Sequence, residues 1–182
     1  MSRYNIRNML GEIRIFITNY CIAYIPSHHI RLWYYRNIMK FKIAHGASIH
    51  IGCKFSCAQH FELGETSTIN QNCHIDNRGG ISIGANVNIA SRCALITADH
   101  LIDSPYFEGR NRPITIKDYS FLGYGVTVLG GVLIENGCVI GANSLVYKST
   151  VPYHLYAGNP AKKLKARNQN LNYTTTYRRL FH

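Results

Sequence analysis

Large aliphatic residues recur at every sixth position through the middle of this chain. One phase holds six times in succession, and the same spacing appears upstream in two shorter series. A helix needs apolar residues every three to four positions, so the pattern instead favours a short strand followed by a corner. The positions are Ile51, Cys57, Leu63, Ile69 and Ile75, then Ile83, Ile89 and Leu95, then Ile116, Leu122, Val128, Ile134, Ile140 and Val146.

Three such strands make one coil of about eighteen residues, and stacked coils place their aliphatic side chains in an interior column. We therefore predict a mainly β fold, a parallel β-helix of triangular section. Turn-forming or small residues often follow the aliphatic positions, as at Gly52, Asn70 and Gly141, where corners are expected. The periodicity does not give the handedness of the coils.

The spacing is interrupted between Leu95 and Ile116, which lie 21 residues apart. One coil plus three residues breaks the register, so we expect a loop over 97–113 to leave the solenoid. Loops on a rigid scaffold often carry binding and catalytic residues. This loop contains His100 and a set of hydrogen-bonding and stacking groups suited to a polar acceptor: Asp99, Asp103, Tyr106, Phe107, Glu108, Arg110 and Arg112.

The N-terminal residues 1–45 are expected to form a helical cap, ahead of a solenoid over 46–150 and a C-terminal segment over 151–182. Apolar residues have helical spacing in the first part of the cap, and Pro26 separates it from a second helix. A cap would cover the open strand edges at the end of the solenoid. The apolar residues of the first helix are Ile6, Met9, Leu10, Ile13 and Phe16.

Contact with a membrane surface is a second interpretation of this segment, because basic residues accompany Trp33, Tyr34 and Tyr35. The apolar run from Ile15 to Ile25 is too short to span a bilayer, which takes about 20 residues. The tail over 166–182, with Tyr173, Tyr177 and Phe181, could pack on a neighbour or remain loose.

Composition adds a strong positive charge, since 20 Lys and Arg face 9 Asp and Glu for a formal net charge of +11. The excess lies at the two ends of the 182 residues, a length that suits one domain. Such a field favours a polyanion, an anionic membrane or a phosphorylated ligand. Six cysteines without a CxxC pair favour a reducing compartment, so we expect a cytoplasmic protein, with peripheral membrane contact as an option.

Over 46–165 the chain resembles the hexapeptide-repeat acyltransferases. The most specific feature is the ending Gly158-Asn159-Pro160-Ala161, which basic residues follow. More narrowly, "NQNCHID" (70–76) and "TADH" (97–100) are similar to motifs of the maltose and galactoside O-acetyltransferases and of polysaccharide O-acetyltransferases. The resemblance implies left-handed coils, a homotrimer with sites between subunits, and acetyl-CoA as co-substrate with no metal required.

The same resemblance implies a catalytic role for His100 and a supporting role for Asn72. Removing a proton from an attacking hydroxyl suits an imidazole, which titrates near neutral pH. For Asn72 a left-handed turn at a solenoid corner remains an equal alternative. A buried thiol is a poor nucleophile, so direct attack by the acceptor is preferred to a covalent step on Cys73 or Cys93.

The expected contacts to coenzyme A lie towards the end of the solenoid. Lys148, Lys162 and Lys163 would bind its phosphates, which accounts for the basic cluster better than a nucleic-acid partner does. The pantetheine arm would lie along Gly123, Ser144 and Tyr147. The acceptor would be bound by Asp76, Asp99, Asp103, Arg110, Arg112 and Tyr124, of which Tyr124 replaces a small residue and could narrow the groove.

The sequence therefore predicts transfer of acetyl from acetyl-CoA to a hydroxyl of a sugar or polysaccharide precursor. N-acetylation of an amino sugar or an antibiotic-like amine is the alternative, because it would use the same histidine. A zinc carbonic anhydrase on the same coil would need three histidine ligands, whereas the sequence offers one His-x4-His pair, His45 and His50, and the acetyltransferase motifs are preferred. A non-catalytic solenoid would not explain the histidine loop and the Gly-Asn-Pro-Ala ending together.

Overall fold

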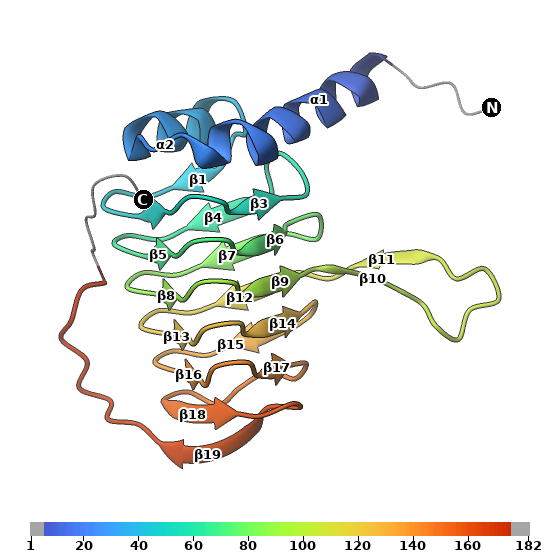
Figure 1. Cartoon of the computed structure of the whole chain (residues 1–182). Coiled ribbons are helices and arrows are strands. Elements are labelled where there is room, and N and C mark those ends of the chain that lie inside the picture. Colours follow the sequence, from blue (N-terminus) through green and yellow to red (C-terminus); the bar gives the residue numbers. More distant parts are fainter. Residues whose placement is uncertain (1–5, 176–182) are drawn as a thin grey trace.

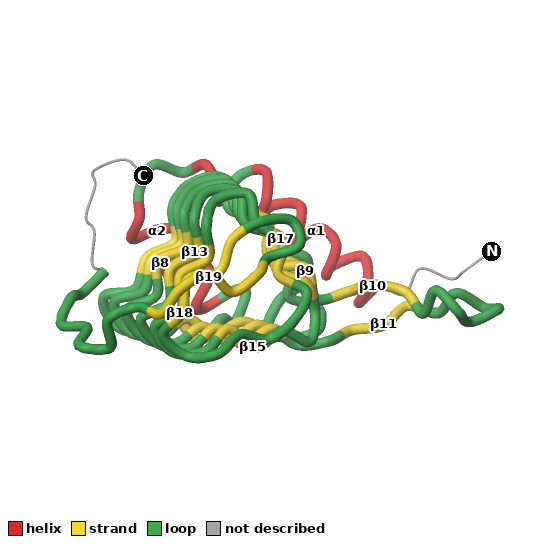
Figure 2. The backbone as a smooth tube through the Cα atoms, turned by 90° about the horizontal axis from the view of Figure 1, so that it is seen from below, coloured by secondary structure: helices red, strands yellow, loops and turns green. Residues whose placement is uncertain are grey.

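Short strands stack into three parallel walls in the computed structural model, which describes residues 6–175 (Figures 1 and 2). The first wall contains β1 (Lys42–Ile43), β4 (Phe61–Leu63), β7 (Ile81–Ile83), β12 (Ile114–Ile116) and β15 (Leu133–Ile134). The second wall contains β2 (Ser48–Ile49), β5 (Thr68–Ile69), β8 (Asn88–Ile89), β13 (Phe121–Leu122), β16 (Val139–Ile140), β18 (His154–Ala157) and β19 (Lys162–Ala166).

The third wall contains β3 (Lys54–Phe55), β6 (His74–Asp76), β9 (Ala94–Ile96), β14 (Thr127–Leu129) and β17 (Leu145–Val146). Neighbouring strands within a wall run parallel, except that β19 turns back antiparallel to β18. The prediction of a mainly β solenoid is confirmed.

The interior is a column of stacked aliphatic side chains, as the six-residue spacing predicts. On the second wall the inward side chains are almost fully buried: Ile49, Ile69, Ile89, Leu122 and Ile140. The earliest part of the predicted series is wrong, because Ile51 and Cys57 are half-buried at corners. Ile49 and Phe55 occupy the interior there, and their phase differs by two residues from that of Leu63.

The phase shift reflects coils that are longer than eighteen residues. Ile43 pairs with Leu63 and Leu63 with Ile83, so the first two coils take twenty residues each. The later coils have the expected eighteen, as from Ile116 to Ile134 and from Leu122 to Ile140. The two extra residues of the early coils lie at the corner from the third wall to the first.

At this same corner the chain leaves the solenoid as a long hairpin, called the arm below (residues 98–111). It is built from β10 (Ala98–His100) and β11 (Gly109–Asn111), which pair antiparallel, and it projects away from the walls (Figures 1 and 2). The register of the solenoid is not lost, contrary to expectation. Ile116 of β12 still pairs with Ile83 of the preceding coil and Ile134 of the following coil, so the insertion is confined to one corner.

Two helices cover the first coil, α1 (Ile6–Tyr20) and α2 (His28–Asn37), joined by a short 3-10 helix, η1 (Ile22–Tyr24). From α2, Tyr35 packs into an aromatic cluster with Phe41, Phe55 and Phe61 at the end of the column. From α1, the Asn19 side chain accepts from the Phe55 amide at 2.9 Å and donates to its carbonyl at 2.8 Å. An amide side chain thus satisfies the open edge of the first coil.

The boundaries differ slightly from the expected division of the chain. The first strand of the solenoid begins at Lys42, ahead of residue 46, and the third wall ends at Val146. Neither helix of the described chain combines the length and the hydropathy that a membrane span requires.

After β19 the chain returns along the solenoid as a strap, residues 167–175, so its described part packs on its own subunit (Figure 1). The Arg167 guanidinium donates to the carbonyls of Tyr119 and Gly137, both at 3.0 Å. Thr175 donates to the Thr66 carbonyl at 2.6 Å, on an early coil. Tyr177 and Phe181, also considered for packing, lie outside the described residues.

Replacing one inward aliphatic residue should test the column. Ile89→Ala removes a fully buried side chain from a strand between β5 and β13, and we expect the free energy of unfolding to fall by about 2–5 kcal/mol. Ile102→Ala, at an 81% exposed position on the arm, should change it by less than about 0.5 kcal/mol. Urea unfolding followed by circular dichroism measures both, and equal losses would contradict the packing described.

Candidate active site

The arm is held in shape by an ion-pair cluster on its two strands. Asp99 faces Arg110 across the hairpin and accepts two hydrogen bonds from its guanidinium, at 2.7 and 2.9 Å. Arg112 adds a third at 2.5 Å. Hydrogen bonds from Arg110, and then from Arg112, hold the pKa of Asp99 well below its ordinary value. Three residues predicted to bind the acceptor therefore bind one another.

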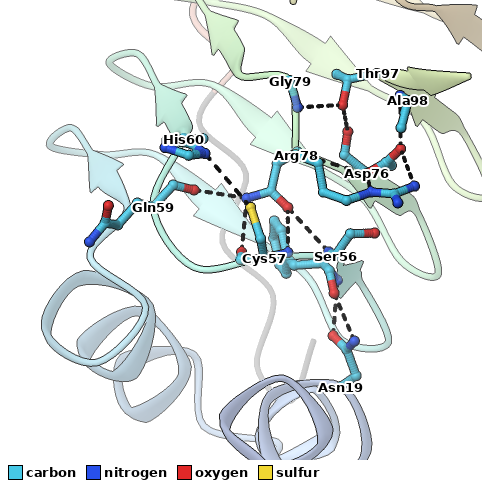
Figure 3. A network of polar contacts seen from close by, with 12 residues as sticks. Asn19, Ser56, Cys57, Gln59, His60, Asp76, Arg78, Gly79, Thr97 and Ala98 are labelled. Atoms are coloured by element: carbon cyan, nitrogen blue, oxygen red, sulfur yellow. Dashed lines mark hydrogen bonds and ion pairs between the residues drawn. The ribbon is translucent and has the colours of Figure 1, made fainter. Parts of the chain in front are cut away.

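The base of the arm is joined to the coil beneath it by Thr97 (Figure 3). The Thr97 hydroxyl donates to the Asp76 carbonyl at 2.6 Å and accepts from the Gly79 amide at 2.8 Å. Across the base, the Arg112 amide donates to the Thr97 carbonyl at 2.8 Å. The chain thus leaves and re-enters the solenoid between two hydrogen-bonded residues, Thr97 and Arg112, called the closed pair below.

Asp76 is also part of this base, since only 2% of it is exposed. Its carboxylate accepts from the Ala98 amide at 3.1 Å and from the Arg78 guanidinium at 2.8 and 3.1 Å (Figure 3). Burial alone would raise the pKa of Asp76, but the hydrogen bonds from Arg78 and Ala98 outweigh it and lower the pKa. Asp76 therefore anchors the arm, although it was predicted to contact the acceptor.

Glycines on both sides of the base allow the coils to approach closely. A Cβ atom at Gly79 would come within 2.9 Å of the Arg112 amide nitrogen, and one at Gly130 within 2.9 Å of the Thr97 carbonyl oxygen. Neither backbone group can move without disturbing the closed pair. A side chain at either glycine would therefore clash with the base of the arm.

His100 lies near the end of β10, exposed, with its ring fixed on one side. The ring stacks on Phe107 with centroids 4.3 Å apart and planes 5° from parallel. Its Nδ1 lies 2.8 Å from the Phe107 carbonyl oxygen, which can only accept. Nδ1 therefore carries the proton of the neutral ring, and Nε2 is left as the basic nitrogen.

The tip of the arm is exposed and largely apolar. Asp103, predicted to contact the acceptor, lies there. Large hydrophobic side chains surround it with exposed fractions of 40% to 83%: Leu101, Ile102, Tyr106 and Phe107. The arm projects away from the walls, so within residues 6–175 its tip is largely exposed to solvent (Figures 1 and 2).

Asn72 and Tyr124 lie at a different corner, where the second wall meets the third. Asn72 has a φ of 60° and its side chain occupies the space beside Gly52, which is the left-handed turn considered from the sequence. It is level with Arg92, eight residues before His100. At about 3.3 Å per residue, roughly 25 Å separate Asn72 from His100 in one chain.

Two residues predicted to contact the pantetheine chain of coenzyme A take part instead in packing and hydrogen bonding between coils. Gly123 is buried, and a Cβ atom there would meet the Ala142 amide nitrogen at 2.7 Å. Ser144 is 1% exposed, and its hydroxyl accepts from the Gly158 amide at 3.0 Å. Only their backbone could contact a ligand.

The cationic residues predicted to bind phosphate are exposed near the last coil. Lys162 and Lys163 lie on β19, the outer strand of the second wall. Tyr147 and Lys148 follow β17, with the ammonium 5.2 Å from the ring centroid. Ala161 donates to the Leu145 carbonyl, so the chain just before the two lysines packs against the end of the third wall.

Buried thiols stack at equivalent positions of three successive coils, Cys53, Cys73 and Cys93. Neighbouring thiols and burial raise the pKa of Cys73 and of Cys93, so both remain protonated and unreactive. Among residues 6–175, no three His, Cys, Asp or Glu side chains gather closely enough to hold a metal ion.

No family model matches the chain. A putative acetyltransferase of Schizosaccharomyces pombe is 36% identical over 127 residues, which are 66% of this chain and 54% of that protein. The chain thus spans about half the length of this relative. The putative colanic acid biosynthesis acetyltransferase WcaF of Escherichia coli is 31% identical over 126 residues, 69% of each chain.

Among solved structures, the fold is similar to the hexapeptide-repeat acetyltransferase VCA0836 of Vibrio cholerae in complex with acetyl coenzyme A. The TM-score is 0.81 at 22% identity, covering 93% of both chains. The chain belongs to the hexapeptide-repeat acetyltransferases. Left-handed coils, implied earlier by the resemblance, are the winding of this family.

Some residues of this hexapeptide-repeat site were missed from the sequence. Phe107 was expected to contact the acceptor, but it orients His100 through its carbonyl and its ring, a role for which a backbone acceptor leaves no residue-type signal. Arg78 was also missed, although it pairs with Asp76. Thr97 could have been found, because it opens the quoted motif "TADH".

The anchoring role of Asp76 predicts a pH-dependent contribution to stability. Because its folded pKa lies below the ordinary 3.8, the stabilisation is present above that value and is lost as pH falls through the folded pKa. Asp76→Asn should therefore lower Tm at pH 7, and the gap from wild type should close as pH falls below about 4. Thermal unfolding over a pH series measures this, with exposed Asp103→Asn as control. A gap independent of pH would contradict the assignment.

Proposed function

We propose that this protein transfers an acetyl group from acetyl-CoA to a hydroxyl of a saccharide, with His100 as general base. The observation that carries the proposal is the orientation of His100. Stacking on Phe107 and the bond from Nδ1 to the Phe107 carbonyl leave Nε2 exposed and able to accept a proton. The acetyltransferase names of the relatives support the donor.

The proposed chemistry is one direct transfer. The thioester supplies an activated acetyl carbon. Nε2 of His100 takes the proton of the acceptor hydroxyl as its oxygen bonds to that carbon, and the carbon–sulfur bond breaks. The imidazolium then returns the proton to the departing thiolate, so the histidine is unchanged after each turnover. The buried, protonated thiols support this route over a covalent one.

Coenzyme A would lie with its phosphates near the end of the solenoid. Lys162 and Lys163 are consecutive exposed residues of β19, and Lys148 lies beyond β17. Cationic groups of this kind suit phosphates as mobile point charges. Tyr147, 47% exposed, offers a ring for contact with the donor.

We further infer a homotrimer whose sites lie between subunits. The arm projects beyond its own solenoid, and its apolar tip would be covered by a neighbouring copy. Because Asn72 lies roughly 25 Å from His100 in one chain, it could act on the same substrate only from another copy. Tyr124, two coils away at the same corner, would then face the acceptor groove.

His100→Ala should test the base directly. We expect release of free thiol from acetyl-CoA, measured with a saccharide acceptor, to fall by about 10²–10⁴-fold. His154→Ala is the matched control, because its Nδ1 also lies near a carbonyl oxygen, that of Pro152 at 2.7 Å, but away from the arm. Equal activity of wild type and His100→Ala would overturn the proposal. Acetylation of amines but not hydroxyls would favour the N-acetyl alternative.

The donor site is tested by ligand-dependent stabilisation. Coenzyme A at about 100 times its dissociation constant should stabilise the wild type by about 2.7 kcal/mol and raise Tm. Reversing both charges, with Lys162→Glu and Lys163→Glu, should abolish the rise. Lys40→Glu, an exposed lysine near the helical cap, is the control and should keep it. A rise that survives the double change would place the phosphates elsewhere.

A further inference from the structure

The helix α1 turns most of its large apolar side chains towards solvent. They lie at positions i, i+1, i+4, i+7, i+8 and i+11, which form one stripe about 120° wide. Their exposed fractions range from 38% to 60%: Met9, Leu10, Ile13, Phe16, Ile17 and Tyr20. The opposite face carries Thr18 and Asn19, both buried, and packs on the first coil. Among the described residues, the stripe thus has no partner that covers it.

The stripe continues onto the neighbouring elements. On α2, Leu32 and Tyr35 face the core, while Ile30 and Trp33 lie on the other side with exposed fractions of 50% and 58%. From η1, Tyr24 adds a ring that is 50% exposed. Both helices lie across one end of the solenoid (Figure 1). We call these exposed residues of α1, η1 and α2 the cap face.

The charge around the cap face is almost entirely positive. Of the eight Lys and Arg in residues 1–61, Arg31 is buried and Lys42 pairs with Glu62, and Glu12 is the only acid within that range. Lys54 lies 4.8 Å from the ring centroid of Tyr20, at the edge of the stripe. Arg14 follows Ile13 on α1, and Arg36 and Lys40 are exposed on and after α2. An apolar surface with exposed aromatic rings and a cationic rim suits the interface of an anionic bilayer.

We propose that the cap face docks the protein onto an anionic membrane surface. The apolar stripe would enter the headgroup boundary, and the cations would contact lipid phosphates. In the homotrimer proposed above, copies arranged side by side would place three cap faces in one plane, so that weak single contacts add.

This docking places the arm at a defined depth below the membrane. The strand β9, which leads into the arm, lies two strands from β3, against which α1 packs. At about 4.8 Å per strand and about 10 Å for the helix, His100 lies roughly 20 Å from the bilayer surface. Resting on the proposed function, we infer that the acceptor is a saccharide joined to a lipid in that membrane.

Vesicle flotation of the full chain tests the docking without any activity measurement. Wild type should float with vesicles of phosphatidylglycerol and phosphatidylcholine, less so with phosphatidylcholine alone, and less at high salt. The double variant Ile13→Asp, Phe16→Asp should lose binding by at least about tenfold, the factor that about 1.4 kcal/mol gives. Val151→Asp, at a 49% exposed position near the opposite end, should bind as wild type does.

Folding, activity and oligomer mass of the double variant are measured alongside flotation. Circular dichroism and Tm must match wild type, because both replaced side chains are exposed. Thiol release with a soluble acceptor should be unchanged, which separates this proposal from the proposed function. Wild type that fails to float with anionic vesicles would overturn the docking. So would a fall in oligomer mass of the double variant by light scattering, because a second copy would then cover the cap face.

Discussion

The closed pair between Thr97 and Arg112 is the constraint on which the rest of the structure depends. It lets fourteen residues leave one corner and return without changing the pairing of any wall strand. Thr97 is hydrogen-bonded to Asp76 and Gly79 of the preceding coil, and Gly130 of the following coil packs against it. A rigid stack thus supports the arm at its base, and the arm needs only short-range contacts of its own to hold His100.

Those short-range contacts position His100 within one chain, but they do not bring it together with the other candidate site residues. The tautomer and the plane of His100 are set within one chain, by Phe107 and by the ion pairs of Asp99. The lysines at the last coil and Asn72 at another corner are also in place, but they lie apart from the histidine. In the proposed homotrimer, each subunit would supply groups already in position, and association would bring them together.

The inward residues of the walls could be predicted from the sequence, whereas the lengths and contacts of the corners could be predicted less well. Inward residues such as Ile89 and Leu122 follow the six-residue phase because stacked coils must repeat the same packing. The phase of Ile51 and Cys57 was wrong because two extra residues at one corner shift every earlier position. For the arm, the segment and His100 were found, but Asp99, Arg110 and Arg112 were assigned to a ligand. Charge in a loop does not reveal whether its partner is a substrate or another side chain, and only the pairing of β10 with β11 decides it.

The strap over 167–175 gives this linear fold a long-range connection. In a stack where each coil contacts only its neighbours, the terminal coils open first and independently of one another. Here Arg167 holds carbonyls of the later coils, and Thr175 reaches the Thr66 carbonyl near the beginning. Fraying of the C-terminal coil would therefore also weaken the hydrogen bond between Thr175 and Thr66 on an early coil. The strap couples the two ends of the solenoid outside its core, and this coupling increases the cooperativity of unfolding.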